Sequence, residues 1–128
     1  LALIPSRRTP AYHLKHLTIA LSGLSYTLWD GQDPNPYPGI LGQADAIIVT
    51  SDSVNMTSEA ALTGKPLLIA KLQKEEGRIA EFHSRMHERG HTIKLETALA
   101  DLSHLYRPFR ALDEMPRLSQ KVATYFGW

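Results

Sequence analysis

The feature that most constrains the fold is residues 46–50, with the sequence AIIVT. This run is continuously apolar and rich in β-branched residues, which is typical of a parallel strand covered by helices on both faces. Residues 51–53 (SDS) follow at once and supply side chains that begin helices. A strand that leads directly into a helix predicts a βαβ unit and therefore a parallel sheet.

The alternation of short apolar runs with helix-period segments continues along the chain. The other expected strands are residues 1–4, 25–29, 67–70 and 92–95. The expected helices are residues 11–21, 40–43, a helix from the 51–53 turn to about residue 63, and residues 78–89, 98–105 and 113–125. We predict one three-layer, Rossmann-like α/β domain with a mainly parallel sheet over residues 1–128.

Composition narrows the class of protein. With 128 residues, 43% of them hydrophobic, the chain has the length and core material of one domain. A formal net charge of +1 disfavours nucleic-acid binding through a broad basic surface. The chain has no cysteine, which excludes disulfides, thiolate zinc sites and cysteine nucleophiles. Because the sequence begins with Leu1, we expect it to be part of a longer protein.

Three polar loops follow predicted strands, and in a parallel α/β sheet ligands bind beyond the carboxyl ends of the strands. They are residues 6–9, 29–37 and 51–55. In the first, Arg7 and Arg8 can bind phosphate oxygens in a bidentate manner. The alternative is a solvated basic turn.

The loop at residues 51–55 begins a predicted helix, whose free N–H groups and positive dipole end suit a phosphate. Ser51, Ser53 and Asn55 can add donors, and Glu59 can accept hydrogen bonds from a ribose diol. The alternative is that Asp52 or Ser53 is an ordinary N-cap and Glu59 a solvated helix residue. The carboxylate of Asp52 counts against a phosphate site.

Two further groups have both a functional and a structural interpretation. Trp29, beside Asp30, can stack on a base or anchor its loop. His83, His87 and His91 recur every four residues, but Gly90 ends the helix before the last of them. We therefore expect a solvated helix face and no metal site, with Ile79, Phe82 and Met86 pointing inward.

Several blocks of the sequence, taken in order, resemble the mitochondrial-fission ELM (elongated mitochondria) family. They are residues 6–9 (SRRT), 35–39 (NPYPG), 44–50 (ADAIIVT), 51–56 (SDSVNM), 58–60 (SEA) and 63–66 (TGKP). Bacterial members are often labelled nucleoside-diphosphate-sugar epimerases. Plant members are discussed as recruiters of dynamin-like proteins, which implies a non-catalytic interaction module.

Residues 44–66 are also similar to the nucleotide-sugar-binding half of GT-B type glycosyltransferases. This similarity implies that the chain is the C-terminal half of a two-domain protein. It places the diphosphate over Ser51, Ser53, Asn55 and Met56, the ribose at Glu59, and the loop after Trp29 near the base. The acceptor site would lie in the absent N-terminal domain, so the isolated domain is expected to bind without turnover.

We therefore expect a nucleoside-diphosphate-sugar-binding domain of a glycosyltransferase-like protein. The alternatives are the recruitment module and, third, an epimerase, which lacks support because no glycine-rich cofactor loop or Tyr-x-x-x-Lys pair occurs. Expected partners are a nucleotide sugar and the missing domain, without nucleic acid or a separate cofactor, in the cytoplasm with optional peripheral association with the inner membrane. The expected site residues are Ser6, Arg7, Arg8, Thr9, Trp29, Asp30, Ser51, Asp52, Ser53, Asn55, Met56 and Glu59.

Overall fold

The computed structural model describes residues 1–32, 34–72 and 75–127. The chain divides into two compact units, Leu1–Gln43 and Ala44–Trp128, and each is described by itself. Each unit contains a parallel sheet whose strands are connected by helices. The predicted parallel α/β class is therefore confirmed, and the prediction of a single domain stays a prediction.

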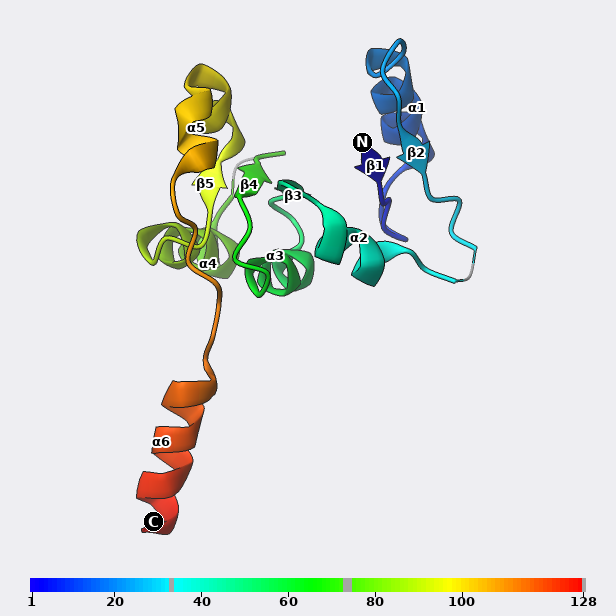
Figure 1. Ribbon diagram of the computed structural model, residues 1–128. Coiled ribbons are helices and arrows are strands. Elements are labelled where there is room, and N and C mark those ends of the chain that lie inside the picture. Colours follow the sequence, from blue (N-terminus) through cyan, green and yellow to red (C-terminus); the bar gives the residue numbers. More distant parts are fainter. Residues whose placement is uncertain (33, 73–74, 128) are drawn as a thin grey trace. The chain divides into compact units, whose positions relative to one another are not determined.

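The first unit contains β1 (Ala2–Leu3), α1 (Ala11–Ala20), β2 (Thr27–Leu28) and α2 (Tyr37–Gln43). β1 and β2 pair in parallel, with α1 between them in the chain (Figure 1). The expected helix at 40–43 begins earlier, because the Asn35 side chain accepts a hydrogen bond from the Tyr37 N–H at 3.0 Å.

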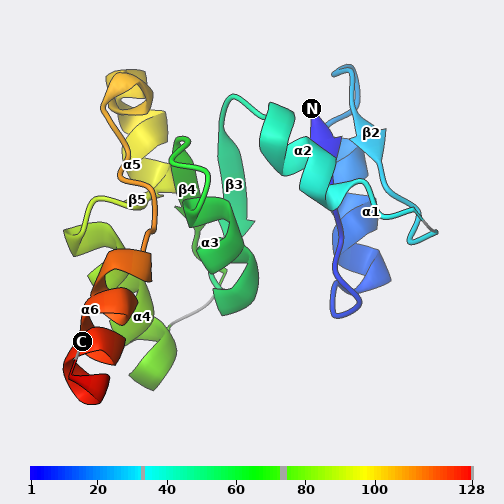
Figure 2. The ribbon, with the colours of Figure 1, turned by 60° about the horizontal axis from the view of Figure 1, so that its bottom comes forward.

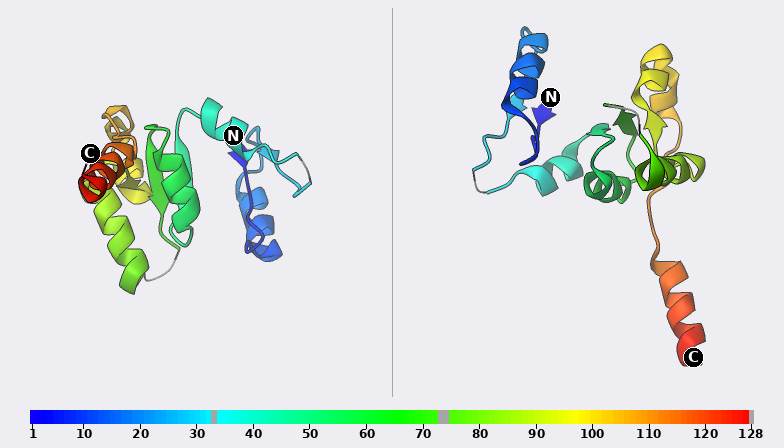
Figure 3. Two further views of the ribbon diagram at one scale, coloured as in Figure 1. Left: turned by 90° about the horizontal axis from the view of Figure 1, so that it is seen from below. Right: turned by 180° about the vertical axis from the view of Figure 1, so that it is seen from behind.

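The second unit is built on a parallel sheet in the order β3 (Ile47–Thr50), β4 (Leu67–Ala70) and β5 (Ile93–Lys94). The connecting helices are α3 (Val54–Ala61) and α4 (Gly77–Glu88). Figures 1 and 3 show both helices on one side of the sheet, and Figure 2 shows α3 alongside β3 and β4. The helix α5 (Leu95–Ala100) packs against β4 and β5 from the other side.

The core of the second unit lies around β4. Apolar side chains from β3 and β4 pack with small residues of α3 and with single residues of α4 and α5. Thr57 is also fully buried, and its hydroxyl donates to the Ser53 carbonyl oxygen at 2.8 Å. The buried hydrophobic residues are Val49, Ala60, Ala61, Leu67, Leu68, Ile69, Met86 and Ala98.

The burial of α4 differs from the prediction in one respect. Met86 is buried and Phe82 half-buried, but Ile79 is 40% exposed and the prediction that it points inward is wrong. His83 takes the buried position instead, one turn further along the same face. The physical reason is a hydrogen bond, since the His83 ring is held by a backbone oxygen beyond the end of β3.

The segment predicted as one helix over 98–105 is divided in two. α5 ends at Ala100, and a 3₁₀ helix, η1, spans Leu102–Tyr106. Asp101 leaves the helical conformation, and its carboxylate accepts a hydrogen bond from the Ser103 N–H at 2.9 Å. Hydrogen bonding from Ser103 also lowers the pKa of the Asp101 carboxyl group.

The last helix is α6 (Met115–Phe126). The segment before it forms hydrogen bonds with the C-terminal ends of α3 and α4. The Arg110 N–H donates to the Gly90 carbonyl oxygen and the Leu112 N–H to that of Ala61, both at 2.9 Å. Gly64 lies close beneath this segment with φ +67°, and a Cβ there would lie 3.2 Å from the Cβ of Ala111. A glycine is therefore suited to this position both sterically and conformationally.

Candidate functional site

Ser51 occupies the first position beyond β3. Its N–H donates to the Ala70 carbonyl oxygen at 3.0 Å, and its hydroxyl oxygen accepts from the Leu72 N–H at 3.4 Å. The Ser51 carbonyl oxygen accepts from His83 Nε2 at 2.7 Å. These three hydrogen bonds join the end of β3 to the end of β4 and to α4. Ser51 is only 2% exposed, so this connection is buried.

Ser53 is the N-cap of α3. Its backbone is extended, and its hydroxyl oxygen accepts a hydrogen bond from the Met56 N–H at 3.3 Å. This is the capping arrangement that the sequence left as the alternative. Because Ser53 is also buried, its side chain serves its own helix.

Only a few groups of this turn are available to a ligand from solvent. Within residues 1–32, 34–72 and 75–127, the N–H groups of Val54 and Asn55 have no hydrogen-bond acceptor. Asn55 and Glu59 are exposed and lie one helical turn apart on α3, and Met56 is half-buried. Asp52 is exposed as well, so a carboxylate stands beside the free N–H groups.

In the first unit, residues 6–9 form a turn closed by their own side chains. The Ser6 N–H donates to Thr9 Oγ1 at 3.0 Å, and the Arg8 N–H donates to Ser6 Oγ at 3.2 Å. Arg7 and Arg8 are exposed. The hydroxyls therefore stabilise the turn, while the two guanidinium groups extend into solvent.

Trp29 and Asp30 hold the loop that follows β2. Trp29 Nε1–H donates to the Gln32 carbonyl oxygen at 2.6 Å, and Asp30 Oδ1 accepts from the Gln32 N–H at 2.9 Å. These bonds match the loop-anchoring interpretation of Trp29. The same residues line a hollow of about 260 Å³ together with Ala2, Leu3, Ile4, Thr27, Leu28, Pro36 and Ile40. That volume is slightly below the range usual for small-molecule sites.

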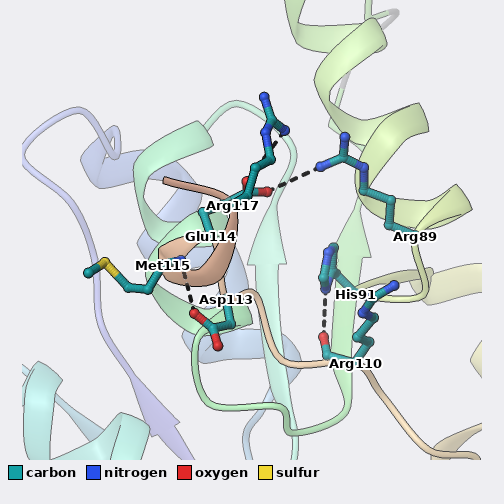
Figure 4. A network of polar contacts seen from close by, with 7 residues as sticks. All are labelled: Arg89, His91, Arg110, Asp113, Glu114, Met115 and Arg117. Carbon is teal, nitrogen blue, oxygen red and sulfur yellow. Dashed lines mark hydrogen bonds and ion pairs between the residues drawn. The ribbon is translucent and has the colours of Figure 1, made fainter. Parts of the chain in front are cut away.

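The three histidines that recur every four residues each form a hydrogen bond with a backbone carbonyl oxygen. His83 Nε2 hydrogen-bonds Ser51, His87 Nδ1 lies 3.0 Å from the Thr92 carbonyl oxygen, and His91 Nδ1 lies 2.6 Å from that of Arg110 (Figure 4). His83 and His91 are buried, so the prediction of a solvated face is wrong for these two. No group of three or more potential metal ligands gathers anywhere in the described ranges.

The sequence analysis assigned His83 to a solvated helix face and did not place it beside the candidate site. It is 8% exposed, and its second ring nitrogen, Nδ1, is buried without a hydrogen-bond partner among the described residues. The available signal was its position between Ile79 and Met86 on one helical face. Its carbonyl partner is 32 residues away in sequence, and no local pattern indicates that contact.

The family comparison covers almost the whole chain. The family described as Mitochondrial fission ELM1 matches residues 1–126. The chain belongs to this family. The mitochondrial fission protein ELM1 of Arabidopsis thaliana is 37% identical over 103 residues, which are 79% of this chain and 24% of that protein.

A bacterial relative is more similar over a shorter stretch. The uncharacterized protein RP120 of Rickettsia prowazekii (strain Madrid E) is 43% identical over 67 residues, which are 50% of this chain and 19% of that protein. The chain thus spans about a quarter or less of the length of these two relatives. No solved structure matches it. In the described part of the chain, every helix is too short or too polar to span a bilayer.

Proposed function

We propose that this chain is a non-catalytic interaction module that recruits a partner protein. The observation that carries the proposal is the match of the fission family to residues 1–126. The partner class is a dynamin-like protein, as the family resemblance implies. The use of Ser51 and Ser53 inside the fold supports this choice, because two of the hydroxyls that a diphosphate site would employ are buried.

One exposed face of α1 offers the chemistry that protein interfaces use. Tyr12, His16 and Ile19 stand at i, i+4 and i+7, and α1 contains no buried residue. Tyr12 is 59% exposed and Ile19 is 60% exposed, and the rings of Tyr12 and His16 meet edge to face. Tyrosine is among the residues enriched at binding hot spots, and an exposed aliphatic neighbour adds apolar contact area.

Direct binding to a dynamin-like protein, measured by isothermal titration calorimetry, tests the recruitment proposal. We expect saturable binding that Tyr12→Ala with Ile19→Ala weakens by about tenfold or more, since a hot-spot residue contributes above about 1 kcal/mol. The matched control is Leu17→Ala with Thr18→Ala on the other side of α1, where Leu17 is an apolar residue with an exposed fraction of 42%. Absence of binding by the unaltered chain would contradict recruitment, and equal effects of the two pairs would exclude this face of α1.

A second candidate function is binding of a nucleoside diphosphate sugar, with the chain as the C-terminal half of a GT-B-like protein. The observation that favours it is the pair of N–H groups of Val54 and Asn55 at the start of α3, which find no acceptor among the residues that the structure describes. Asn55 and Glu59 share the exposed face beside them. We assign the diphosphate to the N–H groups and the ribose to Glu59. Each hydrogen bond to a charged group contributes about 1.5–3 kcal/mol, so several must act together.

Titration with uridine and guanosine diphosphates tests the second candidate. We expect chemical-shift changes at Val54 and Asn55, and about tenfold or greater weakening by Glu59→Ala because the ribose loses its acceptor. Glu88→Ala, an exposed carboxylate on α4, is the control. Unchanged spectra at millimolar diphosphate would eliminate this candidate and leave the recruitment proposal untouched.

A further inference from the structure

The exposed face of α1 also carries positive charge. Tyr12, Lys15, His16 and Ile19 stand at i, i+3, i+4 and i+7 and so share one side of the helix, which we call the basic α1 face. Lys15 is exposed, and no acidic side chain among the described residues pairs with it. An ammonium group therefore lies between the two apolar contacts of this face.

The turn that leads into α1 adds two further cations. Arg7 and Arg8 are exposed, and within the described ranges neither has an acidic partner. Residues 1–29 contain three of Lys and Arg and no Asp or Glu. The acidic residues of the first unit, Asp30 and Asp33, come only after β2 in the sequence. The positive charge of α1 and of the turn before it is therefore not balanced by an acid of either segment.

The aromatic contact of the face is held in place by its neighbours. His16 Nδ1 lies 2.8 Å from the Tyr12 carbonyl oxygen, and the rings of the two residues meet edge to face with centroids 6.5 Å apart. The ring of His13 lies 4.1 Å from that of Tyr12, centroid to centroid. Because the Tyr12 ring is flanked by two imidazoles, it loses less side-chain freedom when a partner binds.

The distribution of apolar residues on α1 argues against a lipid surface as the partner. A helix that lies on a membrane gathers its apolar residues on one face. In α1, Leu14 and Leu17 occupy the side opposite the basic α1 face. Apolar and polar residues are also less separated in α1 than in α3, α4 or α6. The exposed side of α1 thus offers two apolar contacts among cations and no continuous apolar face.

Charge argues against pairing of this face with the same face of a second copy. Such a pair would bring together two sets of the cations of Arg7, Arg8 and Lys15, and neither set includes an acid. Like charges opposed across an interface disfavour it, whereas stable pairs of surfaces have complementary potentials. The complement of this face is a surface with carboxylates around one or two apolar side chains.

We infer that the basic α1 face binds an acidic segment of a partner protein. The carboxylates of that segment pair with Arg7, Arg8 and Lys15. Its apolar side chains pack against Tyr12 and Ile19. The inference rests on the recruitment function proposed above and names the chemistry of the partner.

Selection of peptides from a random library displayed on phage tests the inference without choosing the partner beforehand. The whole chain is the target. We expect the recovered peptides to be enriched in Asp and Glu beside an aromatic or aliphatic residue. Synthetic copies of them, titrated by calorimetry, should bind at low salt and lose most of their affinity at high salt, because exposed charges are screened.

Two triple variants separate the charge of this face from the net charge of the chain. Arg7→Gln with Arg8→Gln and Lys15→Gln is expected to weaken peptide binding about tenfold, at about twofold for each exposed ion pair. The control removes the same charge from three exposed positions of the second unit, Arg78→Gln, Lys94→Gln and Lys121→Gln. None of the six side chains is buried, so circular dichroism should show both variants folded.

Three results would overturn the inference. The first is a set of recovered peptides without enrichment in acidic residues, and the second is equal weakening by the two triple variants. The third is that no peptide is recovered, while phosphatidylserine vesicles or a second copy bind the chain and Tyr12→Ala with Ile19→Ala abolishes that binding. Vesicle flotation and sedimentation equilibrium measure these two alternatives.

Titration with the dynamin-like protein separates this inference from the recruitment proposal. Acidic peptides that bind the basic α1 face, together with no binding of the dynamin-like protein, would remove that partner class and support the inference. Binding of the dynamin-like protein that neither salt nor the variant at Arg7, Arg8 and Lys15 weakens would support recruitment and overturn the inference.

Discussion

Replacing Leu67 with alanine is expected to lower the free energy of unfolding by about 2–5 kcal/mol. Leu67 begins the central strand β4, its exposed fraction is 0%, and it is the largest fully buried side chain among the described residues. Removing three carbon atoms there loses burial and leaves a cavity that the flanking strands cannot fill, because their backbones are fixed by the ladder.

Urea unfolding followed by far-ultraviolet circular dichroism measures this effect. A domain of this size is stable by about 5–15 kcal/mol, so the midpoint for Leu67→Ala should fall by a large fraction of its original value. Leu62→Ala is the control, because Leu62 is 61% exposed at the end of α3 and its loss should cost less than about 0.5 kcal/mol. Equal midpoints for the two variants would show that β4 is not the centre of the core.

Replacing His83 with leucine is expected to cost about 1–3 kcal/mol. Leucine is similar in size to histidine and keeps the apolar contacts of the ring, but it cannot donate to the Ser51 carbonyl oxygen. That oxygen is buried with Ser51 and would lose its donor. The penalty is therefore that of an unsatisfied buried acceptor, with little contribution from a cavity. Loss of Nδ1, which has no partner among the described residues, offsets part of it and places the cost toward the lower end of this range.

The bond also makes a prediction about the ring of His83. A carbonyl oxygen can only accept, so Nε2 carries the hydrogen. Nitrogen-15 spectroscopy should show the Nε2–H tautomer, and urea unfolding should show the lost stability of His83→Leu. Ser84→Ala, an exposed position on the same helix, should leave the midpoint unchanged. A solvent-like, mixed tautomer would refute the assigned contact.

Much of the secondary structure could be predicted from local patterns. The strand predicted at 67–70 is β4 itself, and the helix predicted at 11–21 is α1 with one residue fewer. Pro10 precedes this helix, and Leu14, Leu17 and Leu21 recur within it at helical spacing. Both signals extend over only a few residues, so they can be recognised in the sequence alone. Helix boundaries differ from the predicted ones where a side chain accepts a hydrogen bond from a nearby backbone N–H, as Asn35 does before α2 and Asp101 does before η1.

The candidate site was only partly predictable. The sequence indicated that residues 51–55 form the turn between a parallel strand and a helix, and the structure has that turn. The sequence left open whether the hydroxyls of Ser51 and Ser53 point to a ligand or bond the protein, and in the structure both accept hydrogen bonds from backbone N–H groups. Met56 donates to Ser53 from the same turn, while Leu72 donates to Ser51 from the end of the neighbouring strand.

By itself, then, the sequence determined the parallel α/β class, most strands and helices, and the family, since each depends on residue order and short-range periodicity. Tertiary structure alone decided that His83 is buried where Ile79 was expected, and that the His83 ring bonds the Ser51 carbonyl oxygen 32 positions away. It also decided that no residue of α6 is buried. Such outcomes depend on which distant groups meet in space. A local sequence pattern does not specify which distant group pairs with a polar atom or which residues cover an apolar face.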